Sequence, residues 1–119
     1  MSMGIKTGIF PLRISLKKKD TWELIAEVKN DDGREKMVTV RIDLPDEANF
    51  STVGLTKSFE KNIEGFRANG TVQFKMPVYL SNRADVGNHF GKIRVMEHFS
   101  DFDHVERTYA KDIPFRIVE

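Results

Sequence analysis

Residues 38–45 read Val-Thr-Val-Arg-Ile-Asp-Leu-Pro, and this pattern sets the kind of structure to expect. Aliphatic side chains alternate with polar ones, so an extended strand presents one apolar and one polar face. A helix would instead place its apolar residues three or four positions apart. Pro45 ends the pattern because proline lacks the N–H group that a strand ladder needs. We therefore predict a half-buried β-strand over residues 38–44.

The same alternation recurs on both sides of this stretch. It predicts further strands over residues 12–16, 22–28, 72–80, 90–99 and 105–118. Residues 55–67 are ambiguous, because Phe59, Ile63 and Phe66 also fit helical spacing; we favour a short strand followed by an irregular turn. Asn-Asp-Asp-Gly at 30–33 and Asn-Gly at 69–70 are typical turn sequences. A break in the alternation near Glu97 indicates a β-bulge.

These segments predict an all-β fold, a seven-stranded immunoglobulin-like Greek-key β-sandwich. In chain order the expected strands are A (12–16), B (22–28), C (38–44), C′ (55–67), E (72–80), F (90–99) and G (105–118). Pro77 and Pro114 lie inside strands E and G, and proline within a sheet is confined to edge strands. Sheets ordered A-B-E and C′-C-F-G satisfy this condition. We expect residues 1–119 to form one domain, with residues 1–10 as an N-terminal arm.

The composition agrees with a folded globular domain. Of 119 residues, 39% are hydrophobic and 31% charged, a balance that argues against a disordered chain. The net charge of +1 gives no electrostatic reason to expect binding to nucleic acid or a membrane. The absence of cysteine excludes disulfides and cysteine-based zinc sites. Neither a signal peptide nor a membrane-spanning run is visible, so we expect a cytoplasmic protein.

Three short stretches resemble the adhesion-related immunoglobulin-like domains of archaeal and bacterial proteins, the CARDB type. They are Val28-Lys29-Asn30 before a glycine-containing turn, residues 38–45, and Gly91-Lys92-Ile93-Arg94-Val95 at the start of strand F. The resemblance extends over about residues 11–118. It implies the sandwich fold and, at most, a non-enzymatic binding or spacer role.

Two expected loops carry candidate metal ligands. The F–G loop contributes imidazole and carboxylate groups, and the B–C loop contributes carboxylates. The residues are His98, Asp101, Asp103 and His104 in the first loop, and Asp31 and Asp32 in the second. Both loops lie at the same end of such a sandwich, so their side chains could converge on Ca²⁺ or another divalent ion. Asp and Asn also favour turns for conformational reasons alone. We expect no other cofactor.

The residues point to binding rather than to catalysis. No nucleophile motif or phosphate-binding glycine loop is present, and the spacing of His89, His98 and His104 singles out no catalytic triad. Six aromatic residues do not all fit the inward register of the strands. They are Phe50, Phe66, Tyr79, Phe99, Phe102 and Tyr109. Exposed rings would indicate a protein partner or self-association, although such rings can also cap the open ends of a sandwich.

We therefore predict a non-enzymatic binding or assembly module that acts through a protein–protein surface, either as a homo-oligomer or as an accessory subunit. The first alternative is a Ca²⁺- or carbohydrate-binding sandwich that uses the loops around residues 30–32 and 101–104. The second alternative is a hydrolase on the same scaffold, which would need a cleft where a histidine meets a carboxylate and a nucleophile.

Overall fold

The computed structural model describes residues 3–10, 13–17, 22–50, 56–81, 84–98, 102 and 104–119. Within these ranges the chain forms nine strands. They are β1 (Met3–Phe10), β2 (Arg13–Ser15), β3 (Trp22–Asn30), β4 (Lys36–Asp43), β5 (Ala48–Asn49), β6 (Ser58–Phe66), β7 (Thr71–Leu80), β8 (Gly87–His98) and β9 (Val105–Val118). The described residues contain no helix, and hence no helix that could cross a membrane.

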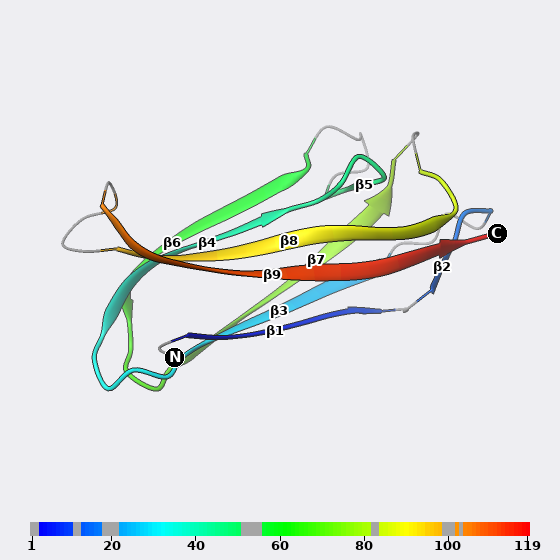
Figure 1. The fold of residues 1–119 in the computed structure, drawn as a ribbon. Coiled ribbons are helices and arrows are strands. Elements are labelled where there is room, and N and C mark those ends of the chain that lie inside the picture. Colours follow the sequence, from blue (N-terminus) through cyan, green and yellow to red (C-terminus); the bar gives the residue numbers. More distant parts are fainter. Residues whose placement is uncertain are drawn as a thin grey trace.

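The strands form two layers that enclose one core (Figure 1). One sheet has the order β1-β3-β7-β5 and the other has the order β2-β9-β8-β4-β6. All pairs are antiparallel except β2 with β9. The principal dimensions of 47 × 23 × 18 Å describe an elongated sandwich, with strands along its length. The predicted all-β, immunoglobulin-like sandwich is confirmed, and the ambiguous residues 55–67 supply strand β6.

The N-terminal segment differs from the prediction. Most of the expected arm, residues 1–10, is strand β1, which pairs with β3 along its whole length. The expected strand A at 12–16 is only the short β2, which runs parallel to β9 in the opposite sheet. The reason lies in β1 itself, where Met3 and Ile9 are buried and supply the apolar face that strand A was expected to provide. The N-terminal part of the chain therefore contributes one strand to each sheet, β1 to the first and β2 to the second.

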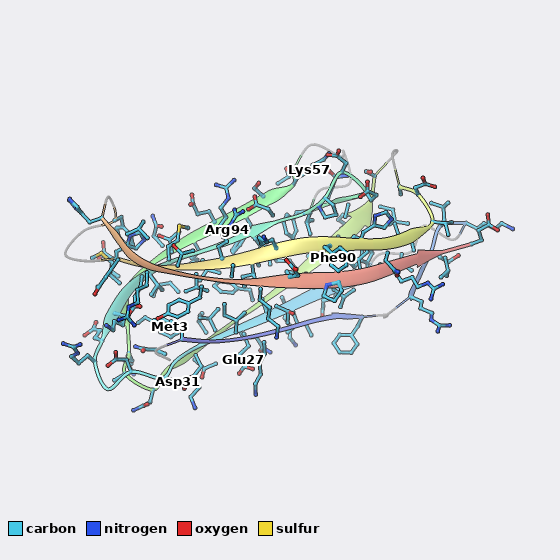
Figure 2. All side chains as sticks on the ribbon, in the orientation of Figure 1. Met3, Glu27, Asp31, Lys57, Phe90 and Arg94 are labelled. Carbon is cyan, nitrogen blue, oxygen red and sulfur yellow. The ribbon has the colours of Figure 1, made fainter. Side chains whose placement is uncertain are left out.

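The core lies between the two sheets, where side chains fill the space between the layers (Figure 2). Val38, Val40 and Ile42 of β4 have no exposed surface, as their alternation predicts. Trp22 of β3 is 1% exposed, and its ring centroid lies 4.7 Å from that of Phe115 on β9. This ring pair joins the two sheets. The other buried hydrophobic residues are Met3, Ile9, Ile14, Leu24, Ala26, Val28, Leu44, Ala48, Phe66, Val78, Ile93, Val95, Ile113 and Ile117.

Contrary to the prediction from the prolines, the two strands that contain them are not the outermost strands of their sheets, because β5 lies beyond β7 and β2 lies beyond β9. Pro77 pairs with Glu23 of β3, and the described residues of β5 pair with β7 at Tyr79 and Leu80. Pro114 pairs with Phe90 of β8, and the described residues of β2 pair with β9 at residues 116–118. Among the described residues, neither proline therefore takes part in the pairing with the outer strand. The predicted bulge is present, as a register shift between Glu97 and His98.

A charged cluster on the outer face of the five-stranded sheet gives a testable pH dependence. Asp43 accepts hydrogen bonds from Arg41 Nε at 3.1 Å, Ser58 Oγ at 2.8 Å and Arg94 Nη1 at 3.3 Å. Desolvation acts to raise the pKa of Asp43, but the hydrogen bonds and the two guanidinium charges outweigh it and lower the pKa. A lowered pKa means that this stabilisation is present above the ordinary carboxyl pKa and is lost as the pH falls through the folded-state value.

We expect Asp43→Asn to destabilise the fold by about 1 kcal/mol at neutral pH, because it removes the charge that three donors surround. The difference from wild type should shrink only as the pH falls below the ordinary carboxyl pKa and through the lower folded-state pKa of Asp43, where the wild-type carboxylate is itself protonated. Urea denaturation across this pH range measures the effect. Asp112→Asn is the control on the same face, since Asp112 has only a 4.0 Å contact with Lys92 and is 63% exposed. A pH-independent deficit in Asp43→Asn would contradict the prediction.

Candidate functional site

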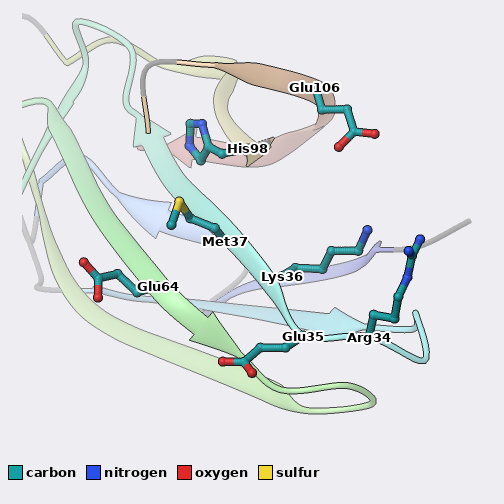
Figure 3. Close-up of a pocket in the computed structure, with 7 residues that line it drawn as sticks. All are labelled: Arg34, Glu35, Lys36, Met37, Glu64, His98 and Glu106. Atoms are coloured by element: carbon teal, nitrogen blue, oxygen red, sulfur yellow. The ribbon is translucent and has the colours of Figure 1, made fainter. Parts of the chain in front are cut away.

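One end of the sandwich carries a polar groove of about 450 Å³. Figure 3 shows its walls. They come from β4 and the turn before it, from β6, from the end of β8 and from the start of β9. Its lining residues are Arg34, Glu35, Lys36, Met37, Glu64, His98 and Glu106. We call this feature the end groove. It lies where the B–C and F–G loops were expected to converge.

Lys36, which lines the end groove, forms an ion pair with the buried Glu97. Lys36 Nζ lies 3.0 Å from Glu97 Oε1 and 3.4 Å from Asp32 Oδ2, so one ammonium group joins the β3–β4 turn to β8. Glu97 is 2% exposed, and its Oε2 accepts a hydrogen bond from the Tyr109 hydroxyl at 3.2 Å. The hydrogen bond to Glu97, together with the attraction of both carboxylates, raises the pKa of Lys36 despite desolvation. Lys36 therefore keeps its charge at neutral pH.

Asp32 is part of the same network. Desolvation would raise the pKa of Asp32, but the charge and hydrogen bond of Lys36, with the help of Arg34, lower it. The backbone N–H of Asp32 also donates to Asn30 Oδ1 at 3.0 Å, which fixes the turn. Asp31 lies at the edge of the turn and pairs with Lys29 at 3.5 Å. Both predicted carboxylate ligands of this loop thus already have a lysine as counter-ion.

His98 is the polar residue of the end groove with an unsatisfied atom. The Thr39 hydroxyl donates to Asn62 Oδ1 at 2.7 Å, so it can only accept from His98 Nε2, which lies 2.7 Å away. This arrangement places the ring proton on Nε2 and leaves a lone pair on Nδ1. Nδ1 is buried and has no hydrogen-bond partner among the described residues, and the rings of His98 and Phe102 meet edge to face with their centroids 5.1 Å apart. A buried imidazole lone pair of this kind is available to a ligand.

The predicted metal ligands are only partly placed. Asp31, Asp32 and His98 lie at this end of the sandwich, and His104 is exposed at the start of β9. Asp101 and Asp103 lie outside the described residues. Within the described ranges, no three His, Cys, Asp or Glu side chains are close enough to hold a metal ion. The six-residue metal site therefore stays a prediction.

Three of the six aromatic residues lie in the core or pack against it. Phe66 is 4% exposed, and Phe50 and Tyr109 pack against the core while partly buried. Tyr79 and Phe102 are also only partly exposed, and Phe99 lies outside the described residues. The large exposed hydrophobic residues of the described chain are others: Phe10, Val86, Phe90 and Val105. The expectation of an exposed ring is thus wrong for Phe66, and the other four described rings of the six are partly buried.

A second candidate surface is apolar and lies on the side of the sandwich between β6 and β7. The sequence did not predict it. Phe59 and Ile63 of β6 are in register with the fully buried Ile42 and Val38 of β4. They face the core in the same way, yet they are only partly buried. The same holds for three apolar residues of β7, namely Val72, Phe74 and Met76, whose partners on β3 are fully buried.

We call these five side chains the apolar seam: Phe59, Ile63, Val72, Phe74 and Met76. The rings of Phe59 and Phe74 meet edge to face, with their centroids 5.5 Å apart, so the two sheets touch across the seam. Beside them lies an apolar groove of about 180 Å³ that is lined by Phe50, Thr56, Ser58, Phe59, Met76 and Pro77. The seam side chains are thus partly exposed to solvent, while the core residues behind them stay fully buried.

The strand order and the shared core define the chain as an immunoglobulin-like β-sandwich. No protein-family model matches the sequence. No curated protein matches it in sequence either. The fold itself is common, since 185 chains of solved structures resemble it. The fold alone therefore cannot assign a function.

Two of these structures illustrate the range of proteins with this fold. The major pilin subunit BcpA of Bacillus cereus matches with a TM-score of 0.66 and 8% sequence identity, over 98% of this chain and 40% of the pilin chain. The alkylpurine DNA glycosylase AlkC of Pseudomonas fluorescens, bound to DNA containing an abasic site analogue, matches with a TM-score of 0.52 and 10% identity. That match covers 98% of this chain and 30% of the glycosylase. The chain therefore spans less than half the length of either protein.

Proposed function

We propose that this chain is a non-enzymatic binding module that recognises a protein partner through the apolar seam. The observation that carries the proposal is the partial exposure of five core-facing side chains along two strand edges. Contiguous exposed apolar surface is unfavourable in water, and its usual role is to bind another molecule. Pockets filled by apolar and aromatic side chains also provide most of the energy in protein interfaces.

The fold likeness agrees with this proposal. One of the two neighbours is a pilin subunit, a protein that works as part of an assembly. We also propose that the chain is a domain of the CARDB type, whose role is binding or spacing. Self-association and binding to a different protein both remain compatible with a seam of this kind, and the experiment below separates them.

Partner capture with matched variants tests the seam. We expect the double variant Ile63→Thr/Met76→Gln to recover at least about tenfold less partner from native extract than wild type, the effect of losing one or two interface anchor residues. Phe90→Ser is the control, because Phe90 is 58% exposed and lies away from the seam on the outer face of β8. Loss of capture by Phe90→Ser alone would contradict the seam. A strict monomer in light scattering with no captured partner would remove the proposal altogether.

A second candidate function is divalent-ion binding at the end groove, and His98 is the observation that favours it. The Nε2–H···Thr39 hydrogen bond fixes the ring tautomer in the way that supports a metal-bound histidine, and Nδ1 has an unused lone pair. Together with Asp101, Asp103 and His104, it would offer the mixed nitrogen and oxygen ligands that suit zinc. Asp31 and Asp32 would be the more distant members of the proposed site.

We expect Zn²⁺, if it binds here, to raise the melting temperature by about 5 °C or more at saturation, because binding to the folded state alone stabilises it. His98→Phe should abolish the rise. His89→Ala is the matched control, since His89 bonds to the Asp85 carbonyl and to Glu47 at the other end of β8. A melting temperature unchanged by Zn²⁺, by Ca²⁺ and by a chelator would reject the ion site.

A further inference from the structure

The edge of β6 differs from the other edge of the apolar seam. Among the described strands, β6 pairs only with β4 and is the last strand of its sheet, so the backbone N–H and C=O groups on its other side have no partner in another described strand. Its nine residues, Ser58–Phe66, include no proline. β7 has Pro77, which cannot donate a ladder hydrogen bond. A strand added along the seam can therefore complete its hydrogen bonds on β6 but not on β7.

One charge lies within the apolar seam. Lys61 is in register with the buried Val40, which places it on the core-facing side of β6, between Phe59 and Ile63. Lys61 is exposed and takes part in no ion pair with another described residue. The seam thus presents an apolar–cationic–apolar sequence along β6. A complementary strand would present apolar, acidic and apolar side chains at alternate positions.

We propose that β6 is the docking edge for an extended segment of a partner protein, which adds as a sixth strand to the five-stranded sheet. Alternate apolar side chains of this segment fill the seam against Phe59, Ile63 and Phe74, and a carboxylate between them pairs with Lys61. This proposal rests on the proposed function, and it adds the chemistry of the partner and the edge that binds it. Strand addition of this kind combines main-chain affinity with side-chain specificity.

A second copy of the same edge fits this chemistry less well than an acidic strand does. If two β6 strands paired antiparallel about Asn62, Glu60 of one would lie opposite Glu64 of the other. If they paired about Lys61, the two ammonium groups would face each other, and like charges at directly opposed positions destabilise a strand pair. Pairing about Ile63 opposes no like charges, but it places Gly65 opposite Lys61 and so supplies no carboxylate for that ammonium group.

The test uses the blocked peptide TVTDTVT, in which two valines flank an aspartate on one face. Titration into ¹⁵N-labelled protein should shift the amide signals of β6 and slow their hydrogen exchange. The matched peptide TVTKTVT should bind about tenfold more weakly, because it replaces an attraction by a repulsion. The charge-reversed variant Lys61→Glu should invert this preference. Because Lys61 is exposed, this variant leaves the core unchanged.

Each outcome decides the proposal. Shifts in β6 together with an inverted preference in Lys61→Glu support it. Equal affinity for the two peptides, shifts centred on β1, β7 or β9, no binding at millimolar peptide, or dimerisation of the chain through β6 overturns it. The proposed function is judged separately. If Ile63→Thr/Met76→Gln loses its captured partner while Lys61→Glu keeps it, the seam binds the partner without this strand.

Discussion

Replacing Asn30 by alanine should lower the free energy of unfolding by about 4 kcal/mol, because several backbone groups lose their hydrogen-bond partner at once. Asn30 has no exposed surface. Its Nδ2 donates to the carbonyl groups of Arg34 at 3.0 Å, Phe66 at 3.1 Å and Arg67 at 3.1 Å. Its Oδ1 accepts from the N–H of Asp32, and its own N–H donates to the Gly70 carbonyl. One side chain thus joins the β3–β4 turn to the β6–β7 turn.

A domain of this size has a total stability of about 5–15 kcal/mol, so such a loss leaves a substantial unfolded population in mild denaturant. Urea denaturation measures the loss, and Asn88→Ala is the control because Asn88 is exposed on β8. The control should change stability by no more than about 0.5 kcal/mol. Asn30→Asp keeps the shape but removes donors that face three carbonyls. If Asn30→Asp were neutral at pH 7, the role assigned to the amide donors would be wrong.

Asn30 also shows what the sequence could and could not reveal. Its place in Asn-Asp-Asp-Gly identified a turn, and the turn is present at residues 31–34. The turn propensity of asparagine is a local property, whereas its contacts with Phe66 and Arg67 depend on a turn that lies 36 and 37 positions away. The local pattern predicted the β3–β4 turn. Only the folded chain showed that Asn30 joins this turn to the β6–β7 turn by hydrogen bonds.

The strands were predictable where the side chains alternate clearly. Val38, Val40 and Ile42 predicted β4 correctly, and Trp22 to Val28 predicted β3. β1 was missed because Gly4 and Gly8 occupy its outer positions and weaken the contrast between its two faces. Glycine also disfavours strands, so local propensity argued against β1. Pairing with β3 along eight residues outweighs this cost.

The candidate surfaces were less predictable than the fold. The end of the sandwich that carries the end groove was anticipated, since the topology of a sandwich brings two particular loops to one end, but of the predicted ligands only His98 is among the described residues that line the groove. The apolar seam was not anticipated, because Phe74 alternates like a fully buried residue, while Phe59 and Ile63 lie four positions apart and fit a helix as well as a strand. Partial exposure depends on how far the two sheets separate along one side, and periodicity carries no information on that distance. Lys61, at an inward position of an edge strand, was the one local signal of an open side.

Removing the partner of a buried carboxylate is the second large effect that we expect. Lys36→Met should destabilise the fold by about 3 kcal/mol, because it removes the ammonium group 3.0 Å from Oε1 of Glu97, which is 2% exposed. The double variant Lys36→Met/Glu97→Gln should recover much of this loss, since it removes both charges. Tyr109→Phe removes the hydrogen bond from the Tyr109 hydroxyl to Glu97 and should cost less, about 1 kcal/mol. A double-mutant cycle in urea gives the coupling energy directly.

The raised pKa of Lys36 adds a second readout to the same cycle. A raised pKa means that the stabilisation is present below the ordinary lysine pKa and is lost as the pH rises through the folded-state value. The deficit of Lys36→Met should therefore narrow at strongly alkaline pH. Lys57→Met is the control, because Lys57 forms its 3.0 Å pair with Asp46 at an exposed site and should contribute about 0.5 kcal/mol or less. If Lys36→Met and Lys57→Met lowered the free energy of unfolding equally, the Lys36–Glu97 pair would contribute no more than a solvated surface pair, and the prediction would be wrong.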